Sequence, residues 1–375
     1  MILSLTCDGW RVFWKKENGM RRFVWMTAVA VGISLGTAAG AAVPMQQGGG
    51  DLRVYFADVE GGQATLFVTP RGESLLVDTG WPGAGGRDAD RIVALCKQAG
   101  VAKIDNLVVT HFHTDHVGGV PQLLAKIPVG RVIDHGDNTE TNDPATLSGW
   151  AAYQKVLAEG HLTRLSVKAG DVLPVHGMRV EVVSANGEVI GKPLVGGGAG
   201  AMNPECATSP TKNAEGSEND RSIGMMITFG RLRILDLGDL TWAKERPLMC
   251  PVNKLGRVDV YIVSHHGMDR SGSPALVKAI APRVAIMDNG AKKGGAASTY
   301  DQIEDSGKLE DLWQLHTAVG NDDDHNADDS RIANLEGVDA GHSLELVARR
   351  DGSFAVTNER TGETVRYKAD ALEGK

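Results

Sequence analysis

Three histidines and one aspartate stand within six positions, directly after the apolar run that ends near Thr110. In an extended segment alternate side chains share one face, so His111 and His113 are expected to point at one metal ion. Asp115 and His116 follow at a turn into a helix and are expected to serve a neighbouring ion. Imidazole nitrogens and carboxylate oxygens are suitable zinc ligands. The spacing therefore predicts a site for one or two divalent metals, most simply zinc. The alternative is a histidine-rich loop that binds no metal, but such a loop would not require three histidines and an aspartate to be clustered at the end of a strand.

Three other segments carry residues of the same kinds, in the order Asp78-Thr-Gly, Gly238-Asp239 and His265-His266-Gly. Together with His-x-His-x-Asp-His, this order resembles the metallo-β-lactamase superfamily over about residues 52–288. The resemblance implies that Asp78 braces the histidine loop and that Asp239 bridges both metals, although an N-cap role for Asp239 in the helix after Thr241 is the alternative.

The closing motif implies one further metal-binding histidine. We select His266 as the ligand, which leaves His265 as a neighbouring proton-transfer group, with the reverse assignment open. The family pattern also has a third histidine for the first metal, after the second-half hairpin, and residues 184–188 contain none. His135, at the end of another predicted strand, is the nearest substitute.

The segment Asp58-Val-Glu-Gly-Gly-Gln-Ala64 and the later motifs are most similar to the metallo-hydrolase domain of competence-type DNA-uptake proteins and to a related choline-phosphate esterase. This resemblance implies hydrolysis of a phosphodiester or another small ester by a metal-activated hydroxide. Asp115 would orient the hydroxide and His265 would protonate the leaving group. The alternatives are a lactone or β-lactam hydrolase, a non-catalytic exported metal-binding module and, least favoured, a di-iron redox centre.

Short apolar or alternating runs, separated by glycine and proline turns, begin at Leu52 and again near Asp171, and helix and strand patterns follow each series. Two similar halves predict two sheets packed face to face with helices outside. The expected fold class is α/β, an αββα four-layer sandwich (metallo-β-lactamase fold), within a hydrolase domain at 51–290. The helical patterns cover residues 88–99, 117–127, 150–159, 242–249 and 274–280.

Two segments interrupt this pattern. Residues 191–221 are rich in Gly, Pro, Ser, Thr and Asn, and we expect a lid in preference to a disordered insertion. Residues 291–375 are expected to combine an insertion, with a helical stretch near 309–315, and a C-terminal β extension on the same domain. The extension would cover a sheet edge with strands at 343–347, 354–357 and 364–367.

The chain of 375 residues is 42% hydrophobic and has 4 cysteines, which excludes disordered, collagen-like and disulfide-knot classes. Its net charge of −8 lacks the basic excess that phosphate backbones require, so no general nucleic-acid binding is expected. We expect a small-molecule substrate instead.

Residues 1–42 have the basic, apolar, small-residue order of an export signal, and Met20 before Arg21-Arg22 suggests that translation starts there. Five basic and two acidic side chains would leave with this segment, which changes the net charge from −8 to −11. The mature protein is expected to be periplasmic or secreted, without a membrane span. Pairing of Cys206 with Cys250 after export stays open.

Overall fold

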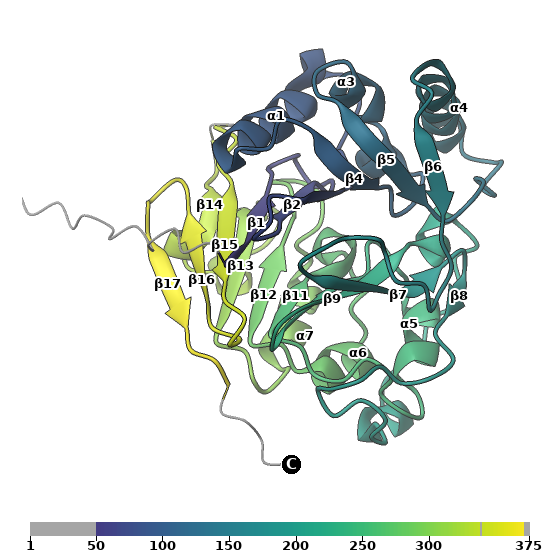
Figure 1. Ribbon diagram of the computed structural model, residues 1–375. Helices are drawn as coiled ribbons and strands as arrows, with labels where there is room; N and C mark the ends of the chain where they lie inside the picture. The colour runs from purple at the N-terminus through teal and green to yellow at the C-terminus, as the bar shows by residue number, and fades with distance from the viewer. Residues whose placement is uncertain (1–49, 338–339, 371–375) are drawn as a thin grey trace, which may run out of the picture. The chain divides into compact units, whose positions relative to one another are not determined.

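The computed structural model describes residues 50–337 and 340–370, which fall within the compact unit Ala42–Lys375. In this unit two β-sheets pack face to face and helices cover both outer faces (Figure 1). The predicted αββα sandwich is therefore confirmed. The predicted signal segment at 1–42 lies outside the described residues.

The first sheet has nine strands in the order β17-β16-β15-β1-β2-β3-β4-β5-β6. Strands β3 to β6 run parallel to one another, so their carboxyl ends meet at one edge. The strands of this sheet are β1 (Leu52–Phe56), β2 (Thr65–Val68), β3 (Ser74–Val77), β4 (Ile104–Val108), β5 (Val129–Asp134), β6 (Thr163–Ser166), β15 (Leu344–Ala348), β16 (Phe354–Asn358) and β17 (Thr364–Tyr367).

The second sheet has eight strands in the order β14-β13-β12-β11-β10-β9-β7-β8. Strands β10 to β14 are parallel. The strands of this sheet are β7 (Arg179–Ala185), β8 (Glu188–Val189), β9 (Gly224–Phe229), β10 (Leu232–Asp236), β11 (Val260–Ile262), β12 (Val284–Met287), β13 (Asp311–His316) and β14 (Ile332–Asn334).

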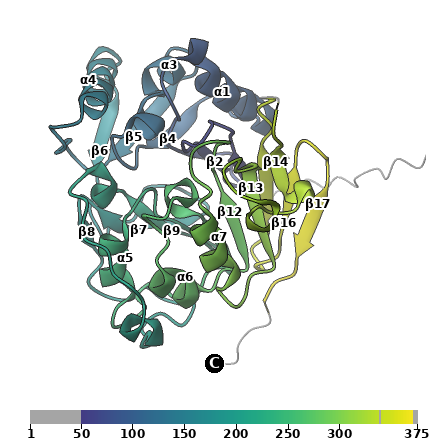
Figure 2. The same cartoon turned by 180° about the vertical axis from the view of Figure 1, so that it is seen from behind.

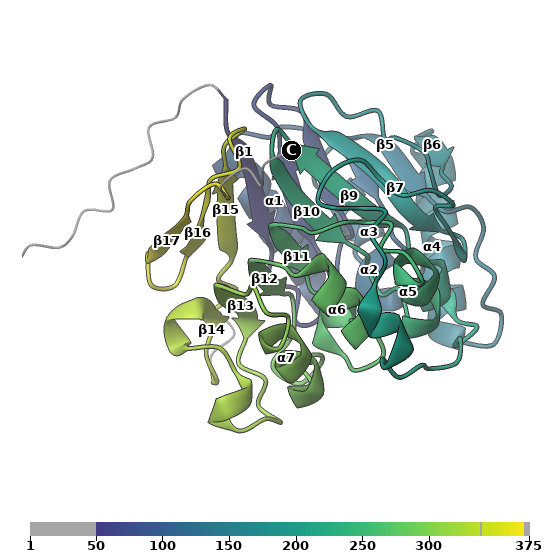
Figure 3. The same ribbon diagram turned by 90° about the horizontal axis from the view of Figure 1, so that it is seen from below.

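Helices cover each sheet on the side away from its partner. The helices are α1 (Arg87–Ala99), α2 (Thr114–Val117), α3 (Val120–Leu124), α4 (Pro144–Glu159), α5 (Trp242–Met249), α6 (Pro274–Ile280) and α7 (Ala297–Glu304). Helices α1, α3 and α4 lie on the first sheet, as the view from behind also shows (Figure 2). Helices α5, α6 and α7 lie on the second sheet and stand in front of it when seen from below (Figure 3).

Strand β1 shows how the sequence produces this layering. Leu52, Val54 and Phe56 point into the core between the two sheets, whereas Tyr55 packs on the opposite face under the helices. Since successive side chains of a strand alternate between faces, a strand buried on both sides must be apolar at nearly every position. The continuous apolar runs of the sequence therefore mark central strands.

The predicted helical stretch near 309–315 is wrong, because this segment forms β13, which pairs in parallel with β12. Trp313 and Leu315 point into the core between the sheets, while Leu312 packs against the outer helices. This alternation has a period of two, which suits a strand and not a helix. The helix of this region is α7, which begins at Ala297.

Two further expectations concern the segments beside the sheets. The second series of strand-like runs, expected to begin near Asp171, starts with only a single bridge between Val172 and Glu181. The C-terminal extension is confirmed, because β15 pairs with β1 and is followed by β16 and β17 at the edge of the first sheet.

Residues 191–221 contain two 3₁₀ turns, Pro204–Ala207 and Glu218–Arg221. This segment is joined to the end of α5 by a disulfide between Cys206 and Cys250, whose Cα atoms are 5.7 Å apart. Within the part of the chain that the structure describes, we find no helix with the length and hydropathy of a membrane span.

Candidate metal centre

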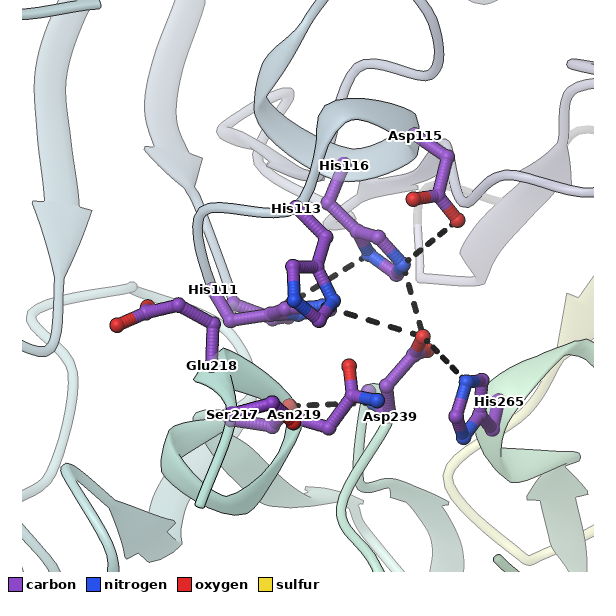
Figure 4. A network of polar contacts seen from close by, with 12 residues as sticks. His111, His113, Asp115, His116, Ser217, Glu218, Asn219, Asp239 and His265 are labelled. Carbon is purple, nitrogen blue, oxygen red and sulfur yellow. Dashed lines mark hydrogen bonds and ion pairs between the residues drawn. The ribbon is translucent and has the colours of Figure 1, made fainter. Parts of the chain in front are cut away.

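Loops at the carboxyl ends of four strands bring the predicted ligands together. Asp78 follows β3, the loop from His111 to His116 follows β4, Asp239 follows β10, and the His265-His266 pair follows β11. Strands β3 and β4 pair in parallel, as do β10 and β11, so the loops of each pair leave their sheet at the same edge. The two edges face one another across the sandwich, and the side chains meet between them (Figure 4).

Asp115, His116, Asp239 and His266 form a buried group that could hold one metal ion, which we call the second metal position. His116 Nε2 lies 3.3 Å from both Asp115 Oδ2 and Asp239 Oδ1, and 3.2 Å from His266 Nε2. His266 Nε2 lies 3.2 Å from Asp115 Oδ2 and 3.5 Å from Asp239 Oδ1. Tetrahedral ligands of a zinc-like ion at about 2.0–2.1 Å would be about 3.3–3.4 Å apart. The four side chains therefore fit a single divalent ion.

The charges of this group favour a cation. Although burial raises the pKa of Asp115 and of Asp239, the neighbouring His116 ring helps to hold both pKa values well below their usual range. Burial disfavours a charged His116 ring, yet the carboxylates of Asp239, Asp115 and Asp78 raise its pKa well above the ordinary value. A divalent metal bound by these side chains would supply the positive charge that otherwise comes from a protonated His116 ring.

His111 and His113 form the start of a neighbouring group, which we call the first metal position. His111 Nε2 lies 3.1 Å from His113 Nδ1, and 3.9 Å from Asp239 Oδ2. Burial, with the adjacent His116 and His113 rings, lowers the pKa of His111 well below its usual value, so the ring is neutral and can act as a ligand. Asp239 therefore presents one oxygen to each position.

Asp78 contacts the His116 ring, in agreement with the bracing role that the family resemblance implies. Its Oδ2 atom lies 2.7 Å from His116 Nδ1 and accepts a hydrogen bond of 2.6 Å from Thr110 Oγ1. Its Oδ1 atom accepts a bond of 2.8 Å from Thr110 N. Asp78 has a positive φ of 61°, a backbone conformation uncommon for a residue other than glycine. These contacts leave His116 Nε2 as the ring atom that faces the other ligands.

His265 and His266 contact different oxygens of Asp239. His266 belongs to the second metal position, whereas His265 Nε2 lies 3.3 Å from Asp239 Oδ2. The other ring nitrogen of His265 lies 3.2 Å from Ser271 Oγ. The arrangement favours His266 over His265 as the ligand of the second position.

Residues 57–200 match the family model of the metallo-beta-lactamase superfamily. The matched stretch contains Asp78 and the loop from His111 to His116. This stretch of the chain is therefore similar to the metallo-β-lactamase superfamily.

Two curated relatives of this chain are longer proteins. Recombination protein 2 of Haemophilus influenzae is 26% identical over 234 residues, which is 62% of this chain and 24% of the relative. ComE operon protein 3 of Bacillus subtilis is 28% identical over 192 residues, which is 51% of this chain and 20% of the relative. These matches confirm the predicted resemblance to competence-type DNA-uptake proteins, and the chain spans about a quarter or less of each relative.

Among solved structures, the metallo-beta-lactamase fold protein YhfI of Bacillus subtilis is similar with a TM-score of 0.42 and 13% identity. The alignment covers 71% of this chain and 96% of YhfI. A likeness at this level adds nothing to the assignment of a function.

The first metal position lacks the third histidine that the family resemblance implies, and His135 contacts other side chains. His135 Nε2 lies 2.9 Å from Glu218 Oε2, and both side chains are fully buried. The His135 ring also packs against Phe112, with ring centroids 4.8 Å apart. Glu218 therefore engages Nε2 of His135, whereas Nδ1 of the same ring is buried without a hydrogen-bond partner among the described residues.

The structure adds two polar side chains that the sequence did not single out. Lys293 Nζ forms an ion pair with Asp115, donates to Gly61 O at 2.6 Å and lies 5.2 Å from the centroid of the Trp81 ring. Glu140 Oε2 lies 3.0 Å from His113 Nε2. The signal for Lys293 was its place in a glycine-rich loop after the strand at 284–287, where the loops of this fold converge.

Asp58, Glu60 and His316 form a second group of metal-ligand types. Asp58 Oδ1 lies 2.7 Å from His316 Nε2, and Asp58 Oδ2 accepts a bond of 2.9 Å from Arg91 Nη1. The arginine and the histidine already balance the buried carboxylate. We therefore assign this group to the packing of α1 and β13 against the loop after β1.

Proposed function

We propose that this chain is an exported, metal-dependent hydrolase that acts on a phosphodiester or another small ester. The observation that carries the proposal is the second metal position, where four buried donor atoms have the separations of ligands around one ion. A divalent metal at such a site supplies an ionised water and polarises the oxygen of the scissile group.

The residues of the chain have separate tasks in this proposal. Asp115, His116, Asp239 and His266 would hold one metal, and His111, His113 and Asp239 would contribute to a second. Zinc suits this set of nitrogen and carboxylate oxygen donors. Asp115 would also orient the attacking oxygen.

His265 is proposed to transfer a proton to the leaving group. Burial lowers its pKa, so the ring is neutral near pH 7 and can both give and take a proton. Its contacts with Asp239 Oδ2 and Ser271 Oγ hold the ring at the edge of the metal centre. The side chain of His265 is 6% exposed, which leaves little water beside it.

Lys293 favours a substrate with negative charge. Its ammonium group is held beside Asp115 by Gly61 O, and its side chain is 30% exposed, so a ligand can reach it from solvent. An ammonium group close to the metals would pair with a non-bridging oxygen of a phosphoryl ester. A neutral lactone offers no such oxygen, and this difference supports phosphodiesters over lactones.

The disulfide between Cys206 and Cys250 supports export, because such bonds persist in oxidising compartments and are rare in the cytosol. The charge of −8 supports a small substrate over general nucleic-acid binding.

The test is metal analysis of the purified protein, together with its turnover of chromogenic phosphodiester, lactone and cephalosporin substrates. We expect bound metal and metal-dependent turnover of the phosphodiester. Preferred turnover of the lactone or cephalosporin would replace the proposed substrate class. Bound metal without turnover of any substrate would favour a binding module.

A further inference from the structure

The first metal position has two imidazole nitrogens and one oxygen of Asp239, but the third histidine of the family pattern is absent. The end of the 191–221 segment lies near this position, where the family pattern would have the histidine. Within that segment, the 3₁₀ turn Glu218–Arg221 precedes β9.

Backbone contacts fix this turn between the two sides of the centre. Glu218 N donates to Glu140 Oε2 at 2.9 Å, and the same carboxylate oxygen lies 3.0 Å from His113 Nε2. A few residues later, Ser222 Oγ accepts from Asp239 N at 3.2 Å. The chain from 218 to 222 therefore passes from the neighbourhood of His113 to that of Asp239.

Asn219 is the residue of this turn with an unused donor atom for a metal. Asn219 is only 3% exposed, and its side-chain Nδ2 donates a hydrogen bond to Glu215 Oε2 at 3.0 Å. Because a carboxylate accepts but cannot donate, this bond fixes which end of the amide is nitrogen. The Oδ1 atom is buried and has no hydrogen-bond partner among the described residues. Figure 4 shows the amide beside Asp239, with its oxygen directed toward the imidazoles of His111 and His113.

A buried amide oxygen without a partner is costly unless something binds it. We propose that Asn219 Oδ1 is the third chain ligand of the first metal position, together with His111, His113 and Asp239. This inference rests on the proposed metal centre and assigns the residue that replaces the missing histidine.

Two histidines compete for this role, and each has a side-chain partner, while Nδ1 of His135 is buried without a hydrogen-bond partner among the described residues. His265 is engaged by Asp239 at Nε2 and by Ser271 at Nδ1. His135 is engaged by Glu218 at Nε2. Asn219 needs no rearrangement of an existing hydrogen bond.

The donor set has a consequence for metal choice. An amide oxygen is a harder ligand than an imidazole nitrogen, so the first position would have two nitrogen and two oxygen donors in place of three nitrogens and one oxygen. We expect this position to release zinc more readily than the second position and to accept Mn²⁺ well.

The experiment measures metal content and affinity, independently of turnover. The full chain is stripped with a chelator, reloaded with Zn²⁺ or Mn²⁺ and analysed for metal per chain, and Co²⁺ spectra report the ligand set. Asn219→Ala should lose the more weakly held metal. Its affinity for that metal should fall at least about tenfold, because even a residue that only hydrogen-bonds a metal ligand typically contributes that much. Asn219→Asp should restore or strengthen Mn²⁺ binding, and Asn219→His should strengthen zinc binding.

Asn253→Ala is the matched control, because Asn253 is also buried but its amide bonds backbone groups of Leu255 and Ala279. It should retain both metals. The inference is overturned if Asn219→Ala keeps both metals at wild-type affinity, or if the wild type binds one metal that this variant retains. If Asn219→Ala does not fold, unchanged Mn²⁺ and Zn²⁺ affinity in Asn219→Asp overturns it equally. A wild type without any metal would overturn the proposed function as well.

Discussion

His116 Nδ1 lies 2.7 Å from Asp78 Oδ2, and this contact turns His116 Nε2 toward Asp239. Asp78→Asn places an amide where the ring and Thr110 Oγ1 both need a carboxylate oxygen. Since partners of metal-binding histidines typically contribute about 10–100-fold to metal affinity, we expect a loss of that size in a folded protein. Competition with a chromogenic chelator measures it.

Asp105→Asn is the control for this substitution. Asp105 accepts hydrogen bonds from Ser74 in the same sheet, at the end of the strands opposite to the metal centre. The Asp105→Asn variant should bind metal with wild-type affinity. If Asp78→Asn also binds metal with wild-type affinity, the contact between Asp78 and His116 does not support metal binding.

Lys293→Met keeps the aliphatic chain and removes the charge beside Asp115. A hydrogen bond to a charged group contributes about 1.5–3 kcal/mol, so kcat/KM for an anionic phosphodiester should fall by about 10–100-fold. Turnover of a neutral carboxylic ester should change much less. Equal losses for both substrates would contradict the assignment of Lys293 to the substrate's negative charge.

Burial raises the pKa of Glu245 to about 7, despite hydrogen bonds from the backbone N–H groups of Gly272 and Ser273. A raised pKa means that the folded state binds this proton more tightly than the unfolded chain does. The stabilisation is therefore complete below the unfolded pKa of about 4.5 and is lost as the pH rises through about 7, which amounts to about 3 kcal/mol.

Urea unfolding of the wild type and of Glu245→Gln at several pH values checks this effect. The glutamine cannot ionise, so the difference in unfolding free energy should move in favour of the variant between pH 5 and pH 8. A difference that does not depend on pH would contradict the raised pKa.

The sequence predicted the parts of the centre that are local in the chain. The ligands from His111 to His116 are contiguous and follow an apolar strand, so alternation along the strand and the turn after it indicated their directions. Most strands were equally predictable, because burial on both faces leaves an apolar run. The segment at 309–315 misled the prediction, because a short apolar run has no periodicity that separates a buried strand from a helix.

The remaining features depend on contacts between distant segments. Glu218 engages His135 across 83 positions of the chain, and Lys293 reaches Asp115 across 178. No spacing rule connects such pairs, and only the packing of the two sheets brings them together. The role proposed for Asn219 likewise depends on where the 191–221 segment ends.

The direct test of the metal centre is the metal content of the purified wild type and of Asp239→Asn, measured with the rate of phosphodiester hydrolysis on the same samples. Asp239 contacts both metal positions, so its substitution should remove metal and reduce turnover at least about a hundredfold in a folded protein. A variant that retains the wild-type metal content and the wild-type rate would contradict the account.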